Sequence, residues 1–213
     1  MVTEVLSDRL ALGAAIGRSN KVINFLAKKL ITLFDLPIAA PSANLSERTS
    51  VTNIMDIDPI LVKKIFVLKD KQSSHGLEST VVRIDTNNEI EVLRYGSITV
   101  EELNKYAKVK IKKKSSISPG NLKKHYSTLK PIRMNAKRIL KNEGLLNFGN
   151  NKLKSKIINL NLSNKKNLNE AAKNFYHYLH KLDQSRCKKI AVVEIPDKGL
   201  GKTINDRLRR AIK

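Results

Sequence analysis

The sequence has 213 residues but only one cysteine, Cys187. A single cysteine excludes an intrachain disulfide, so a reducing compartment is the simpler assumption. We interpret the thiol as structural because one cysteine near a basic helix end carries no catalytic signature. Apolar runs of roughly 18 to 20 residues, as a membrane span requires, are also missing, and no signal-peptide pattern opens the chain. We therefore expect a soluble, cytoplasmic protein with no membrane contact.

Acidic residues are scarce relative to basic ones. The chain carries 19 Asp and Glu against 41 Lys and Arg, a formal charge of +22, and its pI is near 10.1. Such an excess attracts nucleic acid or another polyanion. A solvated, lysine-rich surface without a partner is the alternative, and composition alone leaves both open.

Hydrophobic residues make up 41% of the chain, enough for a real core. Helical spacing of apolar residues predicts an amphipathic helix over residues 20–35, followed by a short strand at 36–40 and a loop from Pro41. β-Branched runs predict further strands at 64–69, 78–85 and 89–94, the last two joined as a hairpin. Thr99 and Glu102 form a capping box that predicts a helix continuing through Tyr106.

Residues 108–120 combine a lysine run, two serines and a Pro-Gly pair, which favours an extended connection and a domain boundary. Beyond it, strands are predicted at 132–136, 145–148, 156–160 and 189–195. A helix is predicted from the apolar stripe that contains Phe175 and Leu179, with Asn164 or Asn167 as its N-cap. Alternating strands and helices predict a small α/β domain with a parallel sheet over residues 131–213.

Four polar elements have the composition of a binding site. They are the loop 41–46, the strand opening 76–82, the strand end at Arg94 with Gly96, and the linker segment 118–126 with its Lys123-Lys124-His125 run. Hydroxyl, amide and guanidinium groups bind anions, and a basic linker can close over a phosphate as a lid. Taken singly, each element has a structural alternative: a serine turn, a solvent-facing strand, a solvated arginine or a plain tether.

Two further patterns are weaker. Residues 199–203 end like a phosphate-binding loop, but Pro196 stands where that motif needs glycine, so we interpret them as a turn and helix start. His177 and His180 are spaced i, i+3 on the predicted helix without a third ligand nearby, and we interpret them as surface histidines.

In their order along the chain, several motifs resemble the long form of the threonylcarbamoyl-AMP synthase family. The motifs are PIAAPSANLS, GLESTVVRID, LRYGSIT, SPGNLKKHYS, NEGLLNFG, LNEAAKNFYHYLHKLD and GLGKTINDRLRRA. The resemblance covers residues 20 to 213. It implies an α/β fold: a partial YrdC-like twisted sheet with helices at 1–107, a basic linker or lid at 108–130, and a small Rossmann-like α/β domain at 131–213.

The resemblance also implies an activity. Members form L-threonylcarbamoyladenylate from threonine, bicarbonate and ATP with Mg²⁺, an adenylyl transfer that serves threonylcarbamoyl modification of tRNA by downstream proteins. By the same resemblance, Ser42 and Ser79 would contact threonine. The ATP-contacting residues would be Asn44, Thr52, Arg94, Lys123, Lys124 and His125. Because positioning and charge stabilisation suffice for such a transfer, no catalytic nucleophile or dedicated metal ligand is expected.

The match to the family lacks the segment that members carry before it, which contains phosphate-gripping basic residues. We expect an N-terminally truncated catalytic domain with weak activity on its own, because half a cleft provides too few contacts for ATP. A separate N-terminal fragment could complete it. Departures within the match are Glu47, Tyr95 and Asn121, where glycine, proline and methionine are typical. A non-catalytic RNA-binding module and an inactive remnant are the alternatives.

Overall fold

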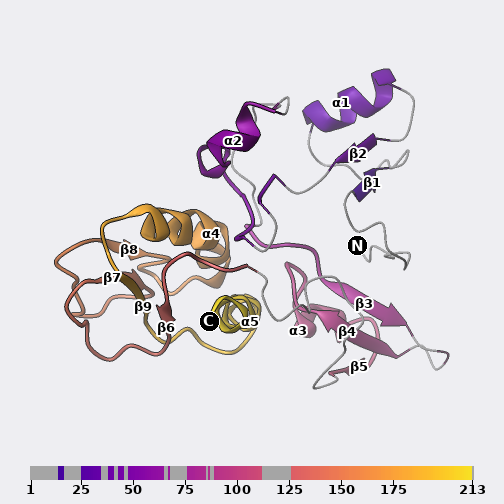
Figure 1. The fold of residues 1–213 in the computed structure, drawn as a ribbon. Coiled ribbons are helices and arrows are strands. Elements are labelled where there is room, and N and C mark those ends of the chain that lie inside the picture. The colour runs from indigo at the N-terminus through magenta and orange to yellow at the C-terminus, as the bar shows by residue number, and fades with distance from the viewer. Residues whose placement is uncertain are drawn as a thin grey trace.

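In the part that the structure describes, the protein is an α/β structure with three separate sheets. The computed structural model describes residues 14–16, 25–34, 38–40, 43–45, 48–64, 67, 76–84, 86, 89–111 and 126–212. Figure 1 shows the four-stranded sheet with its two helices on one side of the molecule and the two- and three-stranded sheets on the other. The mixed α/β class predicted from the sequence is confirmed.

The N-terminal elements are short. They are β1 (Ala14–Ile16), α1 (Phe25–Phe34), β2 (Ile38–Ala40), the 3-10 helix η1 (Ile54–Asp56) and α2 (Pro59–Val62). β1 pairs antiparallel with β2, which confirms the strand predicted over 36–40. Leu30 and Phe34 lie on the predicted apolar face of α1 but are 42% and 56% exposed, so this face is not covered there.

The middle sheet contains β3 (Val81–Ile84), β4 (Ile90–Arg94) and β5 (Val109–Lys110), with α3 (Val100–Leu103) between the last two. β3 and β4 form the predicted antiparallel hairpin, and β5 pairs parallel to β4. The predicted capping box is confirmed: Thr99 Oγ1 accepts from Glu102 N at 3.2 Å, and Glu102 Oε2 accepts from Thr99 N at 2.7 Å. The helix ends at Leu103 in turns instead of continuing through Tyr106.

The C-terminal part is a parallel α/β unit, as predicted. Its elements are β6 (Ile132–Arg133), β7 (Glu143–Asn147), β8 (Asn159–Asn161), α4 (Leu168–Gln184), β9 (Lys189–Val192) and α5 (Leu200–Ala211). The strand order is β6-β9-β7-β8, and every neighbouring pair is parallel. Such pairing needs crossover connections, and α4 supplies the one between β8 and β9.

The predicted apolar stripe of α4 forms the centre of the main core. Ala171, Phe175 and Leu179 are at most 1% exposed, and Asn167 is the N-cap, its side chain accepting from Asn169 N and Glu170 N. Cys187 is buried and free, in agreement with a structural thiol. The helix start predicted near residue 199 is confirmed by α5.

Other predictions remain open or differ. Of the strand predicted over 64–69, Lys64 lies in a turn, Val67 has no regular structure, and the other residues lie outside the described part. The boundaries proposed at 1–107, 108–130 and 131–213 stay predictions. Within the described residues, none of the helices has the length and apolar character to cross a bilayer.

Candidate functional site

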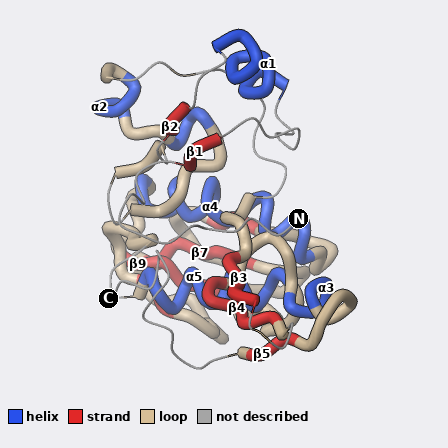
Figure 2. The backbone as a smooth tube through the Cα atoms, turned by 90° about the vertical axis from the view of Figure 1, so that its right-hand side faces the viewer, coloured by secondary structure: helices blue, strands red, loops and turns tan. Residues whose placement is uncertain are grey.

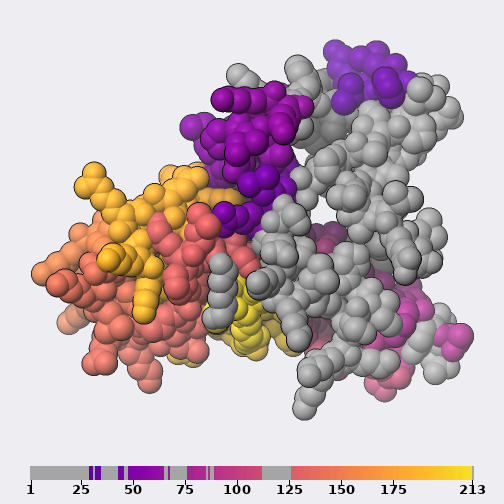
Figure 3. Space-filling model, viewed as in Figure 1, coloured from indigo at the N-terminus to yellow at the C-terminus, as the bar shows by residue number. Residues whose placement is uncertain are grey.

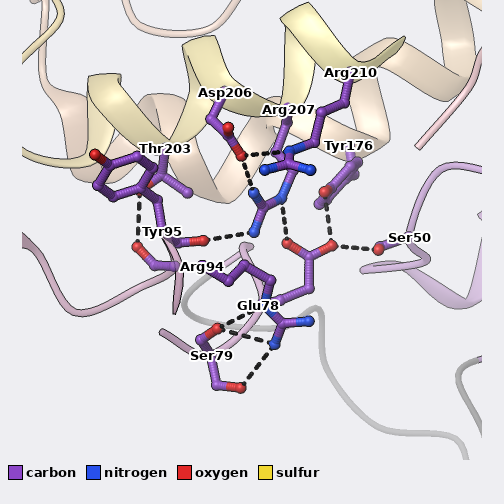
Figure 4. Close-up of polar contacts among 11 residues, drawn as sticks. Ser50, Glu78, Ser79, Arg94, Tyr95, Tyr176, Thr203, Asp206, Arg207 and Arg210 are labelled. Atoms are coloured by element: carbon purple, nitrogen blue, oxygen red, sulfur yellow. Dashed lines mark hydrogen bonds and ion pairs between the residues drawn. The ribbon is translucent and has the colours of Figure 1, made fainter. Parts of the chain in front are cut away.

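Ser79 and Arg94 meet where β3 begins and β4 ends. The Arg94 Nη2 group donates to Ser79 O at 3.0 Å and lies 3.3 Å from Ser79 Oγ (Figure 4). The antiparallel register that places Val81 opposite Arg94 brings the two residues together. Ser79 is exposed and Arg94 half-buried, so a hydroxyl and a guanidinium face solvent side by side. This pair can bind an anionic ligand.

The segment after Arg48 runs beside this strand opening. Ser50 Oγ donates a hydrogen bond to Glu78 Oε1 (Figure 4). Glu78 directly precedes Ser79 in the chain. Two residues after Ser50, Thr52 Oγ1 is buried and has no hydrogen-bond partner among the residues that the structure describes. The predicted contact residue Thr52 therefore retains hydrogen-bonding capacity close to the Ser79 strand.

Asn44 holds its loop together and keeps one acceptor unused. Its Nδ2 donates to Leu45 O at 3.0 Å and to Arg48 O at 3.1 Å. Its Oδ1 is buried, and within the described part of the chain no donor reaches it. Asn44 lines a cavity of about 140 Å³ between this loop and α4, and so does Ser127, whose buried Oγ is likewise unpartnered. The cavity offers polar atoms that a small ligand could satisfy.

The predicted site residues do not all share this cavity. Thr52, Ser79 and Arg94 are absent from its lining, so the described residues present two neighbouring polar regions. Ser42 and the predicted lid residues, Lys123, Lys124 and His125, lie outside the described part of the chain.

The chain that follows the predicted lid is firmly anchored. Tyr126 is 2% exposed, and its ring lies 6.1 Å from that of Tyr176. Ser127 forms a parallel bridge with Arg48, which brings the end of the linker to the loop that contains Asn44. Figure 3 shows the 48–64 segment lying against the C-terminal unit. Thr49 of this segment contacts His180 of α4.

A buried ion pair that the sequence reasoning missed lies between the strand opening and α5. Arg207 Nε donates to Glu78 Oε2 at 3.0 Å, and the arginine is 0% exposed. Burial alone would raise the pKa of Glu78, but Arg207, with hydrogen bonds from Ser50 and Tyr176, holds it below its ordinary value. Burial likewise opposes the charge on Arg207, and the Glu78 carboxylate outweighs it, so the pKa of Arg207 is raised. Both groups are therefore charged.

A signal for this pair was present in the sequence. Arg207 falls on the same helical face as Ile204, Leu208 and Ala211, all of which are buried. A charged residue in an apolar stripe requires an opposite charge from another element. The stripe marks Arg207 as buried, but it does not identify Glu78 as its partner.

The interpretation of His177 and His180 as surface residues is wrong. His177 Nδ1 lies 2.9 Å from Asp56 Oδ2, and its side chain is 15% exposed. His180 Nε2 lies 3.0 Å from Thr49 Oγ1. Both histidines contact the 48–58 segment. The sequence pattern does not predict that this segment lies against α4. Among the described residues, no group of three or more His, Cys, Asp or Glu side chains could hold a metal ion.

Comparison with known families identifies the chain. The family model for the threonylcarbamoyl-AMP synthase C-terminal domain matches residues 98–212, and a model described as telomere recombination matches residues 23–96. The chain belongs to the threonylcarbamoyl-AMP synthase family. A threonylcarbamoyl-AMP synthase of Pyrococcus abyssi is 26% identical over 214 residues, covering 87% of this chain and 61% of the relative. The one from Schizosaccharomyces pombe is 35% identical over 116 residues, 48% of this chain and 28% of the relative.

Solved structures of this family share the fold. The P. abyssi Sua5 protein in complex with L-threonine superimposes with a TM-score of 0.74 at 24% identity, covering 89% of this chain and 62% of that one. A doubly substituted variant of the same protein gives a TM-score of 0.67, also at 24% identity, with 89% and 59% covered. The chain thus spans about three fifths of the length of these relatives.

Proposed function

We propose that the protein takes part in forming L-threonylcarbamoyladenylate from threonine, bicarbonate and ATP, for threonylcarbamoyl modification of tRNA adenosine. The observation that carries the proposal is the Ser79–Arg94 pair, an open hydroxyl and guanidinium at two strand ends in a chain of this family. Family membership favours this enzyme over a non-catalytic RNA-binding module or an inactive remnant.

The proposed chemistry is a nucleotidyl transfer. The threonine amino group bonds to the bicarbonate carbon and one C–O bond breaks with loss of water, which gives a carbamate. A carbamate oxygen then attacks the α-phosphorus of ATP while the bond to pyrophosphate breaks. Negative charge on the phosphates is stabilised by a guanidinium, and alignment of the two reactants supplies the remaining acceleration. Arg94 takes the first role, and the Ser79 hydroxyl orients threonine beside it.

The other site residues complete the proposal. Asn44 and Thr52 carry buried oxygens without protein partners in the described part of the chain, and these oxygens would accept or share hydrogen bonds with the nucleotide. Ser42 contributes to threonine binding. Lys123, Lys124 and His125 belong to a segment that ends at the anchored Tyr126, and they would cover the phosphates as a lid.

Magnesium enters this scheme with the ATP phosphates as part of the substrate. The described site offers hydroxyl, amide and guanidinium groups, which suit phosphate and carboxylate better than a dedicated cation cage. We also propose that the protein works in the cytoplasm and hands its product to tRNA-modification proteins.

Pyrophosphate release is the direct test. The chain is assayed alone and together with a fragment equivalent to the part of the P. abyssi relative that it does not match. Release that requires ATP, threonine and bicarbonate together supports the proposal. Arg94→Lys should lower the rate about 10- to 100-fold because lysine cannot contact phosphate bidentately. Arg83→Lys, an exposed arginine of the same sheet that pairs with Glu91, is the control.

Two outcomes contradict the proposal. The first is the absence of release under every combination of substrates and fragment. The second is an equal loss of pyrophosphate-release rate for Arg94→Lys and Arg83→Lys, since a general effect on the sheet would then account for the lower rate.

A further inference from the structure

Arg207 joins α5 to several separate segments of the chain. Its Nε donates to Glu78 at 3.0 Å, its Nη2 to Tyr95 O at 2.6 Å, and its Nη1 to Asp206 at 2.6 Å (Figure 4). The guanidinium also lies 4.6 Å from the centre of the Tyr126 ring. Figure 2 shows α5 beside β3 and β4, the strands whose ends these contacts hold.

Apart from Asp206 of α5 itself, each contacted residue is a chain neighbour of a proposed ligand residue. Glu78 directly precedes Ser79, Tyr95 directly follows Arg94, and Tyr126 directly follows His125. The Glu78 carboxylate extends the pattern, because its other oxygen accepts from Ser50, two residues before Thr52, and from Tyr176 of α4 at 2.7 Å. The network therefore fixes the backbone on which the proposed ligand groups are carried.

Stability alone gives a poor reason for this arrangement. A buried ion pair often contributes little relative to apolar residues of similar volume, because desolvation offsets the attraction between the charges. The planar guanidinium instead imposes directions, since its N–H groups diverge at fixed angles toward their acceptors. A buried side chain whose nitrogen atoms are all hydrogen-bonded has a fixed position, and it therefore fixes the position of the backbone segments that it contacts.

We infer that Arg207 is a positioning residue: through Glu78 and Tyr95 it sets the placement of Ser79 and Arg94, so that the C-terminal unit shapes the ligand site without touching the ligand. The relevance to catalysis rests on the proposed function. The geometric part concerns the protein alone and is tested without a ligand.

The test uses a double variant. Arg207→Met alone leaves Glu78 charged and buried, so this protein is expected to be strongly destabilised. Adding Glu78→Gln removes that unpaired charge, and the amide oxygen still accepts from Tyr176, so the double variant should recover most of the lost thermal stability. Arg209→Met, on the same helix but 57% exposed in its side chain, is the matched control.

Two measurements separate positioning from a structural role. Hydrogen exchange in the unliganded chain should become at least about tenfold faster at residues 76–80 and 93–97 in the double variant, with residues 143–147 unchanged. In the pyrophosphate assay, the KM for threonine should rise about tenfold relative to the control variant. A double variant that regains stability and exchanges like the parent at both segments overturns the inference.

The measurements also distinguish the two proposals. Faster exchange at the two strand ends, together with a parent chain that releases no pyrophosphate in any combination, leaves the positioning by Arg207 in place and rejects the proposed function. If the parent releases pyrophosphate while the double variant shows unchanged exchange and an unchanged KM, the proposed function stands and the positioning by Arg207 is rejected.

Discussion

Gly96 leaves no room for a side chain at the junction of β3 and β4. A Cβ atom added at this position would lie 2.5 Å from Glu78 O and closer still to Thr80 N and to the carbonyl carbon of Ser79. All three are backbone atoms, which cannot rotate away as a side chain can. The substitution Gly96→Ala must therefore separate the two strand ends.

The size of the effect follows from the contacts across this junction. Ordinary Cβ contacts begin at 3.4 Å, so the backbones must move apart by about 1 Å. Ser97 N donates to Glu78 O at 2.8 Å, and Thr203 Oγ1 donates to Gly96 O at 3.0 Å; such a shift breaks both bonds. With about 1 kcal/mol for each hydrogen bond and about 1 to 3 for overpacking, the expected loss of unfolding free energy is about 3 to 5 kcal/mol.

The activity should fall as well. Ser79 and Arg94 flank the displaced junction, and a misplacement of about 1 Å lowers kcat/KM by about 100-fold. Urea denaturation measures the first effect and pyrophosphate release the second. Gly199→Ala is the control, because its nearest added contact is 3.8 Å away while its φ of +50° still costs about 1 to 3 kcal/mol. A Gly96→Ala protein within about 1 kcal/mol of the parent and equally active would refute this reasoning.

Three further substitutions test other contacts. Arg133→Met leaves the buried Glu143 carboxylate with the Leu140 N–H as a donor but without its ion pair, and because Arg133 is 36% exposed the expected cost is about 1 to 3 kcal/mol at pH 7 by urea denaturation. Arg133 holds the pKa of Glu143 below its ordinary value of 4.5. The pair therefore stabilises the fold above pH 4.5 and loses its contribution as the pH falls through the lowered pKa. The difference in unfolding free energy between variant and parent should shrink over the same pH range. Tyr176→Phe removes a buried hydrogen bond to Glu78 and should cost about 1 to 2 kcal/mol in the same assay. Asn167→Ala removes the N-cap of α4 and should cost about 1 kcal/mol, lowering the thermal midpoint by a few degrees.

The substitutions at Arg133 and Asn167 each have a nearby comparison. Arg138→Met changes an exposed arginine close to Arg133, and Asn169→Ala changes an exposed residue in the first turn of α4; both should stay within about 0.5 kcal/mol of the parent. A loss at Arg133 that does not vary with pH, or equal losses at positions 167 and 169, would contradict the assigned contacts.

Local features of the sequence predicted the local structure well. The Thr99–Glu102 capping box, the β3–β4 hairpin and the stripe of α4 depend on residues a few positions apart, and all are present. The parallel C-terminal sheet was predicted from an alternation of strands and helices, but among the described residues only α4 separates two of its strands, and β6, β7 and β8 are joined by segments without a helix. Strand bounds shifted by up to three residues, since pairing with neighbours decides where a strand ends.

The candidate site was predictable only in part. Turn length and strand pattern predict the hairpin that brings Ser79 near Arg94, but the register shifts by one residue between Val81 and Val82, and this shift places Val81 opposite Arg94. Nothing in the spacing of His177 or His180 revealed that the 48–58 segment would cover them, because these contacts join residues 121 and 131 positions apart.

The sequence by itself determined most of the longer helices and strands, the family and the residue types available for anion binding, because periodicity, caps and motifs act over short stretches of chain. Only the tertiary structure decided which of those residues meet. Glu78 and Arg207 are 129 positions apart, and their pairing depends on how α5 packs against two strand ends. Both charges are enclosed in the same small volume, where each is tolerated only because the other neutralises it; the apolar stripe of α5 marks Arg207 as buried, but no local pattern identifies Glu78 as its partner.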